Sequence, residues 1–117
     1  MKEKISSNGW LLIDKPEGIE SFGVIRKLKF RYSFHKIGFA GTLDPLASGL
    51  LLIGVNKATK KIPNVHNEKK SYIVEIRFGA TTNTLDSEGR FLKMKPISHS
   101  ISDRTHYLKN FIGTYQQ

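Results

Sequence analysis

Residues 41–49 read G-T-L-D-P-L-A-S-G and lead directly into the apolar run L-L-L-I-G-V at residues 50–55. The glycines at both ends of this nonapeptide permit backbone angles that are closed to other residues. Pro45 fixes its own φ and biases Asp44 towards an extended conformation. The sequence therefore predicts a constrained loop that enters a buried strand. Asp44 would have the restricted freedom that a nucleophile or a general base needs, although the same pattern also marks an ordinary turn.

The chain before this loop shows the spacing of two regular elements. A short apolar run at residues 10–13 predicts a strand that ends in a loop. Apolar residues at helical spacing predict a helix over residues 22–32, with Ser21 as its N-cap. Basic side chains cover the other side of that helix, which fits a solvated face and a phosphate-facing surface equally well. Residues 36–43 are predicted to be part strand and part loop.

The chain after the loop adds further predicted elements. Asn56 is expected to cap a short helix over residues 57–62 that ends at Pro63. Period-two alternation over residues 69–79 predicts a half-buried strand. The remaining segments are predicted as a polar loop at 81–89, a brief strand at 90–93 and a helix over 102–112. Strands and helices do not follow a regular βαβ order, so we predict an α+β fold with a mixed, mainly antiparallel sheet and flanking helices.

The composition indicates a globular protein of at most one domain, because the chain has 117 residues, of which 38% are hydrophobic. No apolar run approaches the ~18 residues of a membrane-spanning helix. The absence of cysteine excludes disulfides and thiolate metal sites, and the four histidines lack metal-ligand spacing. We therefore expect no membrane partner, no metal and no cofactor, and we expect a cytoplasmic monomer.

The formal net charge of +9 is unevenly distributed. Lysine and arginine dominate residues 21–70, where the only acids are Asp44 and Glu68. Such a field attracts phosphates and speeds association with them. The charge therefore favours a nucleic-acid partner, and a solvated lysine-rich surface is the alternative.

Several segments around the nonapeptide carry a resemblance to a known family. They are G-W-L-L-I-D-K-P-E-G-I-E-S at 9–21, K-I-G-F-A at 36–40, L-L-L-I-G-V-N-K-A-T-K at 50–60, K-K-S-Y-I-V at 69–74 and F-G-A-T-T-N-T-L-D-S-E-G at 78–89. In this order and spacing they resemble the TruB/dyskerin family of RNA pseudouridine synthases, in its bacterial tRNA pseudouridine-55 branch. The resemblance implies the pseudouridine synthase fold, of which this chain would form the first part.

The resemblance also implies a reaction and a substrate. A uridine in the T-loop of tRNA, at position 55, would be isomerised to pseudouridine: its N-glycosidic bond breaks, the base rotates, and it is rejoined through carbon. This chemistry needs a flipped-out nucleotide but no metal and no redox change. Asp44 matches the essential aspartate of the family, and whether it acts covalently or as a base at the sugar stays open. Tyr72 matches the tyrosine that stacks on the target base, with a core strand residue as the alternative.

Other residues inside the matched segments receive supporting roles. Asp86 matches an aspartate that supports the active site, with an Asx-turn as its alternative. Phe39 stands where bacterial members usually carry a histidine, and its ring can stack but cannot form a hydrogen bond. Gly41, Thr42 and Leu43 are expected to support the active site, and Lys15, Arg26, Phe39, Lys57 and Lys60 are expected to contact RNA.

The chain departs from the family towards its C-terminus. Residues 1–117 contain no match to the segment with the arginine that pairs with the catalytic aspartate, nor to the C-terminal RNA-binding domain. We therefore expect an N-terminal part of a pseudouridine synthase catalytic domain that is inactive, or nearly so, by itself. Two alternatives stay open, a non-catalytic tRNA-binding module and a non-functional gene remnant.

Overall fold

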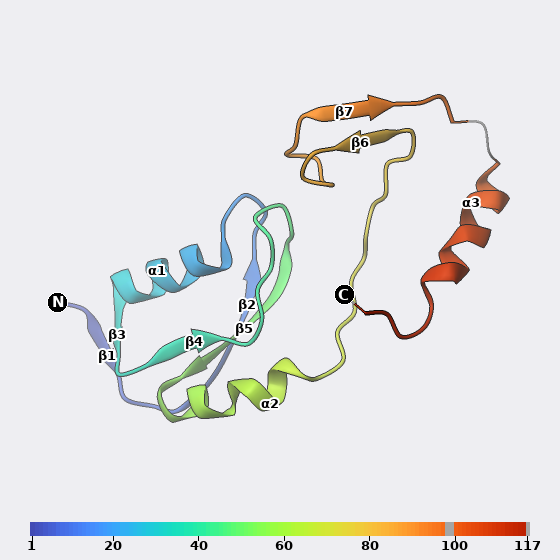
Figure 1. The fold of residues 1–117 in the computed structure, drawn as a ribbon. Helices are drawn as coiled ribbons and strands as arrows, with labels where there is room; N and C mark the ends of the chain where they lie inside the picture. Colours follow the sequence, from blue (N-terminus) through green and yellow to red (C-terminus); the bar gives the residue numbers. More distant parts are fainter. Residues whose placement is uncertain (98–99, 117) are drawn as a thin grey trace. The chain divides into compact units, whose positions relative to one another are not determined.

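The computed structural model describes residues 1–97 and 100–116. The chain divides into two compact units, Met1–Ser71 with two sheets and Tyr72–Gln117 with one (Figure 1). The predicted α+β class is confirmed, and most strand pairs are antiparallel. Among the described residues, no helix combines the length and the apolar character that crossing a membrane requires.

The first unit is built around a three-stranded antiparallel sheet. In chain order its elements are β1 (Glu3–Ile5), β2 (Gly9–Lys15), α1 (Ser21–Arg31), β3 (Tyr32–Phe34), β4 (Ile37–Phe39), β5 (Gly49–Val55), the 3₁₀ helix η1 (Asn56–Lys61) and α2 (Ile62–His66). Strand β5 lies between β2 and β4, and β1 pairs with β3 in parallel as a separate ribbon. The long β2–β5 ladder runs in register from Gly9 opposite Val55 to Lys15 opposite Gly49.

The hydrophobic core joins β5 to α1. Alternate residues of a strand point to the same face, so Leu51, Ile53 and Val55 of β5 face α1 together, where they pack on Val24 and Ile25. All five side chains are buried. This packing fixes β5, and therefore fixes both the loop that precedes it and the helix that follows it.

The predicted elements of the first unit are largely confirmed, with corrections at their ends. The strands predicted at 10–13 and 50–55 and the helix at 22–32 are present as β2, β5 and α1. Ser21 is the first residue of α1 and not its cap, since Glu20 holds the cap position without a side-chain cap bond. Pro63 lies in the first turn of α2 and does not end a helix, because a first-turn proline costs no hydrogen bond.

Asn56 is also not the helix cap that the sequence predicted. It is the first residue of η1, with φ of 54°, and its side chain bonds to backbone groups outside that helix. A left-handed backbone conformation is one that asparagine tolerates better than most residues. Asn56 therefore joins distant segments of the chain through its side chain and does not cap a helix.

The second unit contains the hairpin of β6 (Ala80–Thr82) and β7 (Phe91–Met94), followed by α3 (Ile101–Leu108) and the 3₁₀ helix η2 (Lys109–Phe111). The predicted strand at 90–93 and helix at 102–112 are confirmed with shifted ends. The predicted half-buried strand at 69–79 is wrong, because these residues have no described partner strand and Tyr72 and Ile73 are exposed. Alternation of apolar residues does not make a strand without a hydrogen-bonded neighbour. The predicted polar loop at 81–89 begins inside β6.

Candidate functional site

The nonapeptide of residues 41–49 forms most of the loop between β4 and β5. Gly41 and Gly49 have φ values of 87° and 119°, the region that favours glycine, so the predicted need for glycine at both positions is confirmed. The backbone N–H of Ala47 donates to the Asp44 carbonyl oxygen at 3.0 Å and closes a turn. The Asp44 side chain is exposed at this turn, where a reacting molecule can reach it.

Lys15, at the end of β2, contacts this loop through its side chain. Its side chain is 0% exposed, and its Nζ donates to the carbonyl oxygens of Pro16 at 2.9 Å and Ile19 at 2.7 Å. A longer contact of 3.4 Å reaches the Pro45 carbonyl oxygen. A buried ammonium is costly unless such acceptors replace its water. Lys15 therefore acts as a positioning residue that ties the loop after β2 to the loop of Asp44, and its contact with RNA stays a prediction.

Two further contacts fix the same loop. The Ser21 hydroxyl accepts a hydrogen bond from the Leu43 N–H and donates one to the Leu43 carbonyl, each at 2.8 Å. The backbone N–H of Gly18 donates to the Pro45 carbonyl oxygen at 2.8 Å. Leu43 and Pro45 are thus both held on the two sides of Asp44. The predicted supporting residue Thr42 is exposed beside them.

The segment after α2 approaches the loop at Gly41. A Cβ atom added to Gly41 would lie 3.8 Å from His66 Nδ1 and 3.9 Å from Lys70 Cε. The Lys70 ammonium donates to the carbonyl oxygens of His66 and Glu68, which folds this basic side chain back towards the loop. The sequence analysis did not predict that His66 and Lys70 lie beside Gly41, because residues more than twenty positions apart in the chain leave no local pattern.

The residues predicted to contact RNA have different surroundings in the first unit. Arg26 is exposed on α1, 3.7 Å from Glu20 and 5.5 Å above the Phe22 ring; an exposed ion pair of this kind contributes little to stability. Lys57 and Lys60 are exposed on η1. Phe39 is half-buried and packs against the core, which accounts for its apolar character. RNA contact by these four residues stays a prediction.

Tyr72 and Asp86 belong to the second unit. Tyr72 is 66% exposed, so it is not the core strand residue of the alternative interpretation. Asp86 accepts hydrogen bonds from the Thr84 hydroxyl at 2.5 Å and from the Glu88 N–H at 2.9 Å. These bonds are the local turn that the alternative interpretation of Asp86 described. A common site with Asp44 stays a prediction for both residues.

The pKa of Asp86 gives a test of this turn. The bond from the Thr84 hydroxyl is the largest cause that lowers its pKa from the ordinary 3.8, followed by the Glu88 N–H. Because the folded pKa lies below the unfolded one, the bonds stabilise the turn above about pH 4 and lose this effect as the pH falls through the folded pKa. Thr84→Ala should move the pKa of Asp86 up towards 3.8, as measured by NMR titration of its carboxyl carbon. Thr81→Ala is the matched control and should leave the pKa unchanged; equal values in both variants would contradict the turn.

The fold and the loop define a class of protein: an α+β domain that presents one exposed aspartate on a loop fixed by backbone contacts. Residues 27–117 match the family model described as TruB family pseudouridylate synthase (N terminal domain). The chain belongs to this family, and the resemblance inferred from its motifs is confirmed.

Curated relatives agree with the family assignment. The tRNA pseudouridine synthase B of Fusobacterium nucleatum is 44% identical over 109 residues, which cover 93% of this chain and 38% of the relative. The proteins of the same name from Clostridium kluyveri and Roseobacter denitrificans are 41% and 39% identical over 110 residues, 94% of this chain in both cases and 38% and 36% of the relatives. The chain therefore spans little more than a third of the length of these relatives.

Proposed function

We propose that this chain is the N-terminal part of the catalytic domain of a tRNA pseudouridine synthase. The observation that carries the proposal is the Asp44 loop, where an exposed carboxylate stands between two backbone positions fixed by Lys15 and Ser21. Family membership and the name of the relatives, tRNA pseudouridine synthase B, support the reaction class.

The proposed substrate is a uridine in the T-loop of tRNA, at position 55. The nucleotide would leave its stack and enter beside Asp44. The Asp44 carboxylate would act as nucleophile or as base at the sugar while the N-glycosidic bond breaks, and the base would then be rejoined through carbon. Tyr72 would stack on the uracil, a contact worth ~1–3 kcal/mol.

A tRNA-binding role without catalysis is the second candidate. Basic side chains lie exposed along α1, and of these Arg26 alone is engaged with a carboxylate within the described residues. They are Arg26, Lys27, Lys29 and Arg31. Such a face can hold an RNA backbone whether or not a uridine is modified.

A chimera tests the catalytic proposal. This chain would replace the 109 matching residues of the Fusobacterium nucleatum enzyme, and pseudouridine would be measured in a T-arm transcript after nuclease digestion. We expect turnover by the chimera and by the parent enzyme, and none by the 117-residue chain alone. A folded chimera that binds the transcript but forms no pseudouridine would contradict catalysis and favour the binding role.

A further inference from the structure

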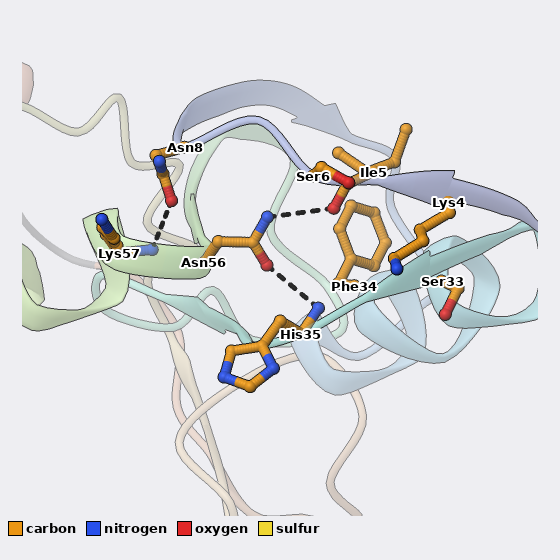
Figure 2. A pocket seen from close by; sticks show the side chains of 9 residues that line it. All are labelled: Lys4, Ile5, Ser6, Asn8, Ser33, Phe34, His35, Asn56 and Lys57. Carbon is orange, nitrogen blue, oxygen red and sulfur yellow. Dashed lines mark hydrogen bonds between the residues drawn. The ribbon is translucent and has the colours of Figure 1, made fainter.

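A pocket of about 580 Å³ with polar and apolar lining residues lies between β1, β3 and the start of η1 (Figure 2). It lies at the other end of the β2–β5 ladder from the Asp44 loop, and of its residues the motifs gave only Lys57 an expected contact with RNA. The residues that line it are Lys4, Ile5, Ser6, Asn8, Ser33, Phe34, His35, Asn56 and Lys57. Its volume is in the range of sites that hold small ligands or single groups of larger ones.

The lining of this pocket is complementary to an anion. It contains the ammonium groups of Lys4 and Lys57, the imidazole of His35 and the hydroxyls of two serines, and none of its residues has a carboxylate. Lys4 pairs with Ser33 in the β1–β3 ladder, so their side chains share a face. Glu3 points to the opposite face of β1 because successive side chains of a strand alternate. Within the described chain, neither lysine forms an ion pair.

The frame of the pocket is rigid because Asn56 holds three segments together. Its Oδ1 accepts from the His35 N–H at 3.0 Å, and its Nδ2 donates to the carbonyl oxygens of Ile5 at 3.0 Å and Ser7 at 2.6 Å. Figure 2 shows Asn56 bonded to Ile5 and His35, with Lys4 and Lys57 on opposite sides of it. Both polar side-chain atoms of Asn56 are thus used in bonds to the backbone. A ligand in the pocket would therefore meet the exposed side chains of Lys4 and Lys57 and not Asn56.

A second contact fixes the backbone at Lys57. The Asn8 Oδ1 accepts a hydrogen bond from the Lys57 backbone N–H at 3.0 Å. This bond fixes the first turn of η1 against the segment between β1 and β2. The backbone that carries Lys57 is therefore set by the fold.

The pocket and the Asp44 loop lie at opposite ends of the β2–β5 ladder. Asn8 directly precedes Gly9 and Asn56 directly follows Val55, and Gly9 and Val55 pair at one end of the ladder. Lys15 and Gly49 form the pair at the other end. Seven residues at ~3.3 Å each separate the two ends by roughly 20 Å. A group in the pocket cannot belong to the nucleotide that reacts at Asp44.

We propose that this pocket binds a phosphate of the RNA backbone, several nucleotides away from the target uridine. The proposal rests on the proposed function, because it takes the RNA substrate as the source of the phosphate. The lining offers ammonium groups, an imidazole and hydroxyls to a phosphodiester, and it contains no carboxylate that would repel one. The pocket would then fix the register of the RNA while the Asp44 loop reads the flipped base.

The test compares two double variants of the 117-residue chain that lose the same charge. Lys4→Gln/Lys57→Gln empties the pocket of its lysines, and Lys93→Gln/Lys95→Gln removes two exposed lysines of the second unit. Binding of a fluorescent full-length tRNA transcript is measured by anisotropy from 50 to 300 mM salt. The pocket variant should bind about three- to tenfold more weakly at low salt, and its salt slope should fall by about one phosphate contact. The control should change affinity by less than about twofold.

The outcomes separate this inference from the proposed function. If the unaltered chain binds no RNA, both the proposed function and the proposed phosphate site are contradicted. If it binds and the two variants behave alike, only the pocket fails. An NMR titration with inorganic phosphate adds a second arm: shifts at Lys57 and His35 together with unchanged RNA affinity would assign the pocket to a free anion and overturn the proposal. Equal thermal midpoints of all three proteins confirm that the comparison is between folded chains.

Discussion

Asp44→Asn in the active chimera should lower the rate of pseudouridine formation by at least about 10³-fold, the range that loss of an acid, a base or a nucleophile commonly costs. Asparagine keeps the size and the oxygen of the side chain, but it can neither attack carbon nor take a proton. The Asp44 side chain is exposed, and its neighbours Leu43 and Pro45 are held through their own backbone. The variant should therefore fold normally and bind the transcript with unchanged affinity.

Glu17→Gln provides the matched control for this prediction. Glu17 is an exposed carboxylate in the turn between β2 and α1, so the change removes the same charge from the same end of the sheet. Its rate should stay within about threefold of the unaltered chimera, since a single exposed charge is strongly screened. A rate for Asp44→Asn above about a tenth of the control would show that Asp44 is a turn residue without a catalytic role.

Lys15→Met should lower the free energy of unfolding of the first unit by ~2–4 kcal/mol. Methionine fills the space of the lysine stem, but it leaves the carbonyl oxygens of Pro16 and Ile19 without their donor in a part-buried position, and an unsatisfied buried group of this kind costs ~1–3 kcal/mol. The removed ammonium no longer has to be kept out of water, which offsets part of that cost. Urea denaturation of the 117-residue chain, followed by circular dichroism, measures the difference.

Lys29→Met is the control for the loss of stability. Lys29 is exposed on α1, where lysine and methionine have similar helix propensities, so the change should be within ~0.5 kcal/mol. A second measurement tests whether Lys15 positions the Asp44 loop. In the chimera, Lys15→Met should reduce kcat by roughly 10²-fold while transcript affinity stays the same, because a small displacement of a catalytic group has a cost of this size. A variant of full stability and full kcat would contradict the positioning role.

Local patterns in the sequence were sufficient for the central elements of the first unit. The apolar run of β5 and the helical spacing in α1 depend on residues close together in the chain, and both elements formed as predicted. Gly41 and Gly49 were also predictable, because the turn requires conformations that glycine favours. The strand expected at 69–79 failed for a related reason: its alternation was present, but the described residues contain no partner strand for it.

The candidate site was predicted only where a single residue carries the signal. Asp44 could be named from its motif, whereas the residues that hold its loop could not. Ser21 has the sequence context of an N-cap, and its contact with Leu43 exists only after β4 and α1 come together. Lys15 has the character of a surface residue, and its burial depends on carbonyl groups that the fold assembles. Such tertiary contacts override local preference.

The contacts of Lys15 also bear on how this part of the protein can diverge. Every acceptor of its ammonium is a main-chain carbonyl, a group that all amino acids possess. Side chains at the acceptor positions can therefore drift without a compensating change elsewhere, provided that the backbone path is kept. The donor has no such freedom, since only a long, flexible ammonium reaches all three oxygens from β2. Covariation between the two loops should consequently be weak even though they are mechanically coupled.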